Sequence, residues 1–69
     1  MLTIGVLGAG HLGKYHLNNW MEIENTRLVG FFDPDDANAT AVEEKYKLKR
    51  YTTAEALMDD CDAVDIVAP

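Results

Sequence analysis

The 69-residue sequence predicts an α/β fold built on a doubly wound parallel sheet. Three observations support this prediction: strand-like apolar segments alternate with helix-competent segments, a glycine-rich turn follows the first apolar segment, and an acidic residue ends the second. Alternating strands and helices fold as a parallel sheet with helices on its faces. Because crossovers between parallel strands are right-handed, we expect the order β-α-β-α-β-α-β to give a sheet with strand order 3-2-1-4.

Four segments have the composition of strands. Residues 3–7 form a nearly unbroken apolar run, which is typical of a strand buried on both faces. Residues 27–32 are rich in β-branched and aromatic side chains, as strands are. Between the later segments there is room for only a short third strand, at residues 50–51, and residues 63–69 read as the fourth.

Three helices are expected between these strands. The first runs from residue 11 to about 21, and its spacing predicts an inner stripe made of Leu12, His16, Leu17, Trp20 and Met21. The second runs from residue 36 to about 46, and four small residues are expected to pack on the sheet: Ala37, Thr40, Ala41 and Val42. The third runs from residue 54 to about 58, with Thr53 as its N-cap and a polar loop at residues 59–62 after it.

The glycine-rich turn between the first strand and the first helix predicts a dinucleotide site. Gly8, Gly10 and Gly13 have the G-x-G-x-x-G spacing of a turn that holds a pyrophosphate. Gly8 would allow the sharp turn, Gly10 would let backbone N–H groups approach the phosphates, and Gly13 would let the helix lie close to the strand. The alternative is a glycine-rich turn that binds no ligand.

Asp33 ends the second strand and lies 20 residues beyond Gly13, where the dinucleotide fingerprint requires an acid for the adenine ribose hydroxyls. A carboxylate accepts from the free 2′-hydroxyl of NAD but repels the 2′-phosphate of NADP, by about 1–4 kcal/mol for two unit charges about 4 Å apart. Asp35 and Asp36 add negative charge, and no arginine directly follows Asp33. The expected cofactor is therefore NAD rather than NADP. On the alternative reading, Asp33 only begins a turn with Pro34.

Two histidines and a cysteine are candidates for other chemistry. His11 lies inside the glycine turn, where it either contacts the pyrophosphate or faces solvent. His16 falls on an apolar helix face, where a histidine is more often a hydrogen-bonded packing residue than a catalyst. These residues lack the close ligand spacing of zinc sites, so no metal site is expected. Three aspartates near Cys61 should raise the pKa of its thiol, which argues against a reactive thiolate.

The composition limits the possible partners and the compartment. A net charge of −6 argues against nucleic-acid and anionic-membrane partners, which require a basic face. No apolar run approaches the roughly 18 residues of a membrane span. A single cysteine and no signal-like segment are typical of a reducing cytosol. We therefore expect a cytoplasmic protein, and we expect it to form a homo-oligomer.

The length of the chain corresponds to one domain or part of one. No helix follows the last apolar segment to cover it. We therefore expect residues 1–69 to be the N-terminal part of a dinucleotide-binding domain within a longer protein. The alternative is a complete small protein that dimerises through its exposed strand edge.

Several segments together resemble the glucose–fructose oxidoreductase / inositol dehydrogenase (Gfo/Idh/MocA) family. Residues 4–16 read IGVLGAGHLGKYH and are similar to the amino-terminal motif of that family, including a histidine three places past the last glycine. Residues 28–35, 51–58 and 62–69 resemble its second strand and acid, its third strand with a short helix, and its fourth strand, which leads to the nicotinamide.

The resemblance implies a Rossmann-like domain of a nicotinamide-dependent oxidoreductase. Such enzymes move a hydride between a carbinol carbon, often on a sugar or cyclitol, and C4 of the nicotinamide. By carry-over, the cofactor-binding residues would be Gly8, Gly10, His11, Leu12, Gly13, Asp33, Ala68 and Pro69. The acid–base lysine of the family lies in a Glu-Lys-Pro segment that this sequence does not contain, so none of these residues would be catalytic.

Two other functions remain open from the sequence. One is a non-catalytic nicotinamide binder, such as a redox sensor or scaffold, because fold alone does not determine function. The other is a methyltransferase-type nucleotide fold, which also places an acid after its second strand; the position of Gly13 favours a dinucleotide instead. In every case, the 69-residue chain alone is expected to have no dehydrogenase activity.

Overall fold

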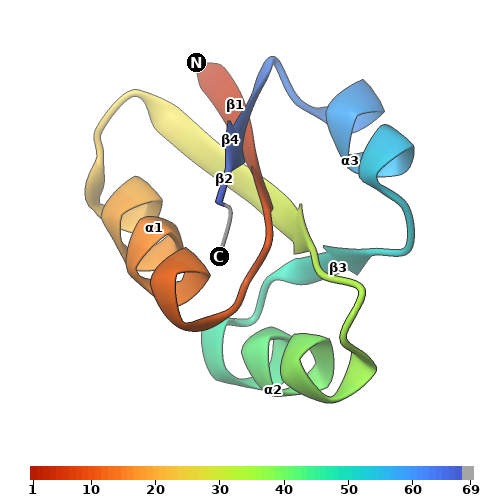
Figure 1. Ribbon diagram of the computed structural model, residues 1–69. Helices are drawn as coiled ribbons and strands as arrows, with labels where there is room; N and C mark the ends of the chain where they lie inside the picture. The colour runs from red at the N-terminus through yellow and green to blue at the C-terminus, as the bar shows by residue number, and fades with distance from the viewer. Residues whose placement is uncertain (68–69) are drawn as a thin grey trace.

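Strands and helices alternate along the whole described chain (Figure 1). The computed structural model describes residues 1–67, apart from the side chains of residues 11 and 12. In order, the elements are β1 (Leu2–Leu7), α1 (His11–Glu22), β2 (Thr26–Phe32), α2 (Asp36–Tyr46), β3 (Lys49–Tyr51), α3 (Ala54–Asp60) and β4 (Ala63–Ile66). The expected β-α-β-α-β-α-β order is confirmed.

The strands form one parallel sheet in the order β3-β2-β1-β4, which confirms both the fold class and the predicted 3-2-1-4 order. The register between β1 and β2 shifts once. Ile4 lies opposite Leu28 and Gly5 opposite Gly30, which leaves Val29 as an extra residue in β2. All strands run the same way, so the turns after β1, β2 and β3 lie at one edge of the sheet.

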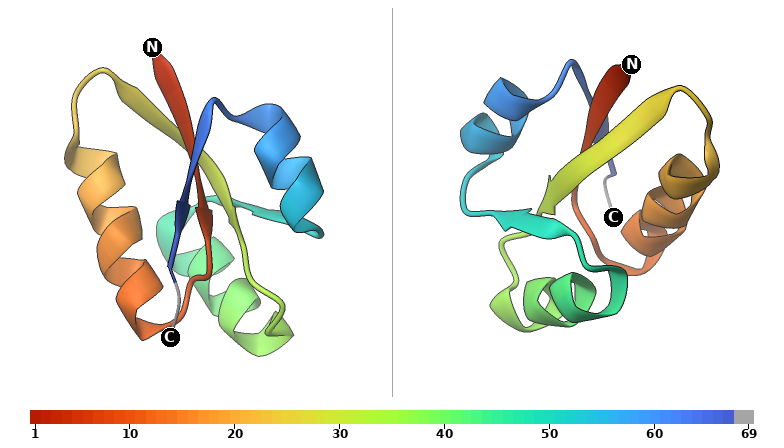
Figure 2. Two further views of the ribbon diagram at one scale, coloured as in Figure 1. Left: turned by 45° about the horizontal axis from the view of Figure 1, so that its top comes forward. Right: turned by 180° about the vertical axis from the view of Figure 1, so that it is seen from behind.

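The helices cover both faces of the sheet, with α1 and α2 on one face and α3 on the other (Figure 2). The larger core lies under α1 and α2 and consists of Val6, Ala9, Leu17, Phe31, Ala39 and Val42. On the other face, the fully buried Leu57 of α3 packs against Gly5 of β1. A Cβ on Gly5 would lie 2.6 Å from the Leu57 side chain, so the missing side chain makes room for α3.

The predicted inward faces of the first two helices were partly wrong. In α1, Leu17 is buried and Trp20 packs against the core, but Met21 is 52% exposed. The side chain of Leu12 lies outside what the structure describes. In α2, the predicted Ala37, Thr40 and Ala41 are exposed, whereas Val42 is buried as expected. The sheet instead meets Ala39, Val42 and Tyr46, whose spacing of three and four residues follows one helical stripe.

Two predicted boundaries differ by two residues or more, and the others differ by one residue at most. Helix α3 continues to Asp60, so Asp59 and Asp60 belong to a helix rather than to a loop. Strand β4 ends at Ile66, so Val67 lies outside it, and residues 68–69 of the predicted strand lie outside the described part of the chain. The predicted N-cap is confirmed, because the Thr53 hydroxyl accepts a hydrogen bond from the backbone N–H of Ala56 at 3.1 Å.

Candidate functional site

The turn after β1 has the backbone geometry that the glycine spacing predicts. Gly8 has a φ of +95°, a conformation that residues with a Cβ rarely adopt, and its N–H donates to the carbonyl of Phe32 at 2.8 Å. A Cβ on Gly13 would collide with the carbonyl oxygen of Gly8. The first turn of α1 therefore lies directly against the end of β1, as expected.

The start of α1 is open. A Cβ on Gly10 would have no heavy atom of the described residues within 4 Å, so that part of the chain leaves open space beside this backbone. Gly10 is also the N-cap residue of α1, and no side chain caps the helix there. The first N–H groups of a helix have no partner within the helix, and they carry the positive end of its dipole. This end of α1 is therefore suited to an anion such as a phosphate.

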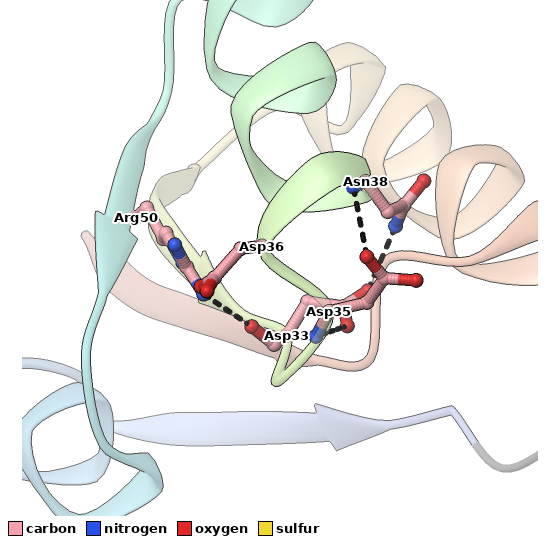
Figure 3. Close-up of polar contacts among 5 residues, drawn as sticks. All are labelled: Asp33, Asp35, Asp36, Asn38 and Arg50. Atoms are coloured by element: carbon pink, nitrogen blue, oxygen red, sulfur yellow. Dashed lines mark hydrogen bonds and ion pairs between the residues drawn. The ribbon is translucent and has the colours of Figure 1, made fainter.

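Asp33 lies directly after β2 and is only 7% exposed. Its carboxylate accepts three hydrogen bonds, from the backbone N–H groups of Ala9 (3.1 Å) and Asp35 (2.9 Å) and from the side-chain amide of Asn38 (2.8 Å). Figure 3 shows Asn38 and Asp35 close to this carboxylate. Burial raises the pKa of Asp33, but the three hydrogen bonds and the charge of Arg50 outweigh it, so the pKa is lowered overall.

These contacts leave Asp33 with capacity for a ligand. An ionised carboxylate has about four acceptor positions, of which three are used here. Among the described residues, the Oδ2 atom accepts from Ala9 and Asn38, whereas Oδ1 accepts only from Asp35. The unused position on Oδ1 can accept a hydrogen bond from one ligand hydroxyl. The lowered pKa keeps the group in the ionised form that accepts such a bond.

Asn38 connects the two turns. Its side-chain amide donates to the carbonyl of Ala9 at 2.7 Å and to the Asp33 carboxylate at 2.8 Å. The glycine turn and the acid are therefore fixed relative to each other by one residue of α2. Sequence reasoning missed Asn38, although its place five residues after the acid, in the first turn of the expected helix, was a usable signal.

Arg50 was also missed as a neighbour of Asp33. Its Nη2 donates to the backbone carbonyl of Asp33 at 3.0 Å and to the carboxylate of Asp36 at 2.6 Å (Figure 3). No arginine directly follows Asp33 in the sequence, but β3 pairs with β2 and places Arg50 opposite Phe31. The signal was present in the predicted strand order, which makes the third strand the neighbour of the second.

His16 contributes to packing through a hydrogen bond, as its position on α1 suggested. Its Nδ1 lies 2.5 Å from the carboxylate of Asp65 on β4, and the indole N–H of Trp20 donates to the same oxygen at 2.9 Å. Burial raises the pKa of Asp65, but the bonds to Trp20 and His16 outweigh it, so the pKa is lowered overall. Asp65 therefore ties α1 to β4, a contact that the sequence did not reveal.

The structure tests some of the remaining sequence predictions, and others fall on residues that it does not describe. The pKa of Cys61 is raised as expected, although burial contributes more than Asp62 and Asp60 do. Among the side chains that the structure describes, which do not include that of His11, no group of three metal-ligating residues comes together. None of the helices that the structure describes is long and apolar enough to cross a membrane. The side chains of His11 and Leu12, and all of Ala68 and Pro69, lie outside the described residues.

Comparison with models of protein families identifies the family of this chain. The model of the family GFO_IDH_MocA, described as "Oxidoreductase family, NAD-binding Rossmann fold", matches residues 2–69. The chain belongs to this family. The resemblance inferred from the sequence motifs is thereby confirmed.

Individual relatives agree with this assignment. UDP-N-acetylglucosamine 3-dehydrogenase of Acidithiobacillus ferrooxidans is 35% identical over 68 residues, which are 99% of this chain and 21% of that protein. Its solved structure has a TM-score of 0.87 at 34% identity and covers 99% of this chain and 22% of its own. Glucose-6-phosphate 3-dehydrogenase of Bacillus subtilis is 28% identical over 69 residues, which are all of this chain and 20% of that protein.

One solved relative contains ligands. Scyllo-inositol dehydrogenase from Lactobacillus casei, determined with bound NAD(H) and scyllo-inositol, has a TM-score of 0.82 at 26% identity. It covers all of this chain and 22% of its own. This chain therefore spans about a fifth of the length of the relatives it matches.

Proposed function

We propose that this chain is the nucleotide-binding part of a nicotinamide-dependent oxidoreductase that acts on a hydroxyl group of a sugar, cyclitol or related compound. The observation that carries the proposal is the pairing of two features at one sheet edge. A helix N-terminus that no described side chain caps lies beside a buried carboxylate, and among the described residues this carboxylate has one unused acceptor position. A dinucleotide needs both features, one for its pyrophosphate and one for its adenine ribose.

In this proposal the residues of the chain bind and orient the cofactor. The backbone N–H groups at the start of α1 would hold the pyrophosphate, with Gly10 leaving room for the phosphate oxygens. Asp33 would accept a hydrogen bond from the ribose. The bound nicotinamide would accept or donate the hydride, and the sheet would hold it at a fixed place relative to the substrate. The proposal extends to Ala68 and Pro69, which would approach the nicotinamide, and to His11 and Leu12.

The choice of NAD over NADP is part of the proposal. Asp33 is ionised and nearly buried, so a 2′-phosphate placed beside it would meet an unfavourable negative charge that solvent screens poorly. NAD(H) bound to the scyllo-inositol dehydrogenase of Lactobacillus casei supports the choice by analogy. The substrate class is inferred from relatives whose names describe dehydrogenases of sugars and inositols.

The test measures dinucleotide binding and hydride transfer with the intact protein. Calorimetric titrations with NAD, NADP and S-adenosylmethionine should show the tightest binding for NAD. Substituting Asp33→Asn should weaken NAD binding about tenfold or more, because a charged acceptor becomes neutral. The matched control Asp59→Asn removes the same charge from an exposed position on α3 and should leave binding unchanged.

Activity separates the oxidoreductase from a non-catalytic binder. The absorbance of reduced nicotinamide should rise when the intact protein is mixed with NAD and a panel of polyols, sugar phosphates and nucleotide sugars. NAD binding without reduction by any member of the panel would favour the sensor or scaffold. Tighter binding of S-adenosylmethionine than of either dinucleotide would overturn the proposal.

A further inference from the structure

Arg50 lies beside the proposed ribose site. It belongs neither to the glycine turn nor to the segment around Asp33, which are the two motifs that predicted the dinucleotide site. Its two hydrogen bonds both come from Nη2, one to the backbone carbonyl of Asp33 and one to the Asp36 carboxylate. The Arg50 side chain is 21% exposed, whereas that of Asp36 is 87% exposed. The guanidinium is therefore held between the turn that carries Asp33 and a carboxylate at the surface (Figure 3).

This position leaves part of the guanidinium unsatisfied. The Nε atom of Arg50 is buried and has no hydrogen-bond partner among the described residues. Buried donors without a partner are uncommon in folded proteins because they cost free energy. An ion pair with an exposed carboxylate contributes little stability. The ion pair with Asp36 is thus the weak contact of the guanidinium, whose Nη2 also donates to the Asp33 carbonyl, so a stronger anion could draw the guanidinium away from Asp36.

We propose that the Arg50–Asp36 ion pair is a second determinant of cofactor choice, in which Asp36 withholds Arg50 from the 2′-phosphate of NADP. This inference rests on the proposed function, because it assumes that the adenine ribose binds at Asp33. A guanidinium is a planar donor suited to phosphate, and an arginine near the ribose is how related folds accommodate the 2′-phosphate. Arg50 is bonded to the residue that would meet the 2′-hydroxyl. Its pairing with Asp36 neutralises it there.

Removing the charge of Asp36 should make Arg50 available to bind a phosphate. The substitution Asp36→Asn removes one negative charge near the 2′ position and frees Arg50 from its ion pair. We expect the ratio of NADP affinity to NAD affinity to rise about tenfold, the order of effect that one charge a few ångströms away produces in a partly solvated site. NAD remains the preferred cofactor because Asp33 is unchanged.

The chain offers a closely matched control. Asp35→Asn removes the same charge one residue earlier, and asparagine caps a helix as well as aspartate does. Asp35 bonds to the backbone of Asn38 rather than to Arg50. A general effect of negative charge would appear in both variants, whereas release of Arg50 would appear only in Asp36→Asn. The double variant Asp36→Asn/Arg50→Met should lose the gain.

The experiment titrates the intact wild-type protein and these variants with NAD, NADP, AMP and adenosine 2′,5′-bisphosphate. The last two probes differ only in the 2′-phosphate and contain no nicotinamide, so they report the site without catalysis. The inference is supported if Asp36→Asn raises the affinity for both 2′-phosphorylated ligands about tenfold while Asp35→Asn stays within about twofold of wild type.

Two results would overturn the inference and leave the proposed function intact. One is unchanged discrimination in Asp36→Asn while NAD still binds. The other is an equal gain in both single variants, which would show a bulk charge effect. If the wild-type protein bound neither dinucleotide, the proposed function would fail and this inference would fail with it.

Discussion

The N-termini of α1 and α2 lie at the same edge of the sheet but are built in opposite ways. At α1, the turn contains three glycines, and no side chain caps the helix. At α2, Asp35 caps the helix by accepting from the backbone N–H of Asn38 at 3.2 Å, and Asp36 lies in the first turn. Helix α1 has no capping side chain among the described residues, whereas the Asp35 carboxylate covers one backbone donor of α2.

Under the proposed function, this difference would let two similar strand–turn–helix units divide the binding of one ligand. An uncapped helix N-terminus attracts an anion, so the pyrophosphate is expected at α1. A terminus that already holds carboxylates repels an anion but can accept hydrogen bonds from neutral hydroxyl groups. The ribose is therefore expected at the turn before α2. In the first unit, added side-chain atoms should reduce either stability or cofactor binding, whereas the second should be sensitive to charge.

The largest effect is expected from adding one carbon to Gly13. In Gly13→Ala the new Cβ would collide with the backbone carbonyl of Gly8, which cannot move without shifting β1 or α1. We expect a loss of about 3 kcal/mol in the free energy of unfolding, at the upper end of overpacking costs. Chemical denaturation of the intact protein measures this loss.

Gly10→Ala is the matched control for this substitution. Its Cβ would enter open space, so the stability should change by less than about 1 kcal/mol. If the pyrophosphate approaches this backbone, however, NAD binding should weaken. Equal losses of stability in the two variants would contradict the close approach of α1 to β1.

The next largest effect is expected at Asn38, which connects the turn after β1 to the turn after β2. Asn38→Ala removes the donor shared by the Ala9 carbonyl and the Asp33 carboxylate. We expect a loss of about 2 kcal/mol, because two hydrogen bonds disappear and one of them reaches a charged group. Asn38→Asp should cost more, since it would place a second carboxylate beside Asp33. Thermal denaturation compares both with Asn19→Ala, an exposed position on α1 that should show almost no change.

The same contrast explains which parts of the site could be predicted from the sequence. The glycine turn works through backbone geometry, and backbone geometry follows from local spacing: Gly8 and Gly13 have the roles that their positions in the motif suggest. The surroundings of Asp33 depend on side chains from two elements, α2 and β3. Asn38 and Arg50 reach it only because α2 and β3 are folded against β2, and no local pattern reports such contacts.

The fold shows a similar limit. Strand order followed from alternation and handedness, and the observed order agrees. The face that α2 turns toward the sheet did not follow from residue size, because several small residues on this helix are exposed. Burial of Ala39 and Val42 depends on the angle at which α2 packs, which is a property of the tertiary structure.

A smaller effect on stability should appear at low pH, through the hydrogen bonds that Asp65 of β4 makes with His16 and Trp20 of α1. The pKa of Asp65 lies below its ordinary value of 3.8, so its ionised form stabilises the fold above that pH. As the pH falls through 3.8 and below, the carboxylate is protonated and this stability is lost. Asp65→Asn should cost about 1.5 kcal/mol at neutral pH. The difference from wild type should shrink below about pH 4.

Denaturant titrations at several pH values measure this difference. Asp59→Asn serves as the control, because Asp59 lies on the exposed side of α3. Its stability should follow that of the wild-type protein at every pH. If the difference in the free energy of unfolding between Asp65→Asn and wild type became larger at acidic pH, the role given to the contacts with His16 and Trp20 would be wrong.

The smallest effect concerns the cap that distinguishes α2 from α1. Asp35→Ala removes the acceptor for the backbone N–H of Asn38 and should cost about 1 kcal/mol. Asp35→Asn keeps an acceptor in the same place and should cost almost nothing, so the pair separates capping from charge. Thermal denaturation measures both. If instead Asp35→Ala were neutral in stability and created a phosphate site at α2, the carboxylate would serve mainly to keep anions away from the second helix.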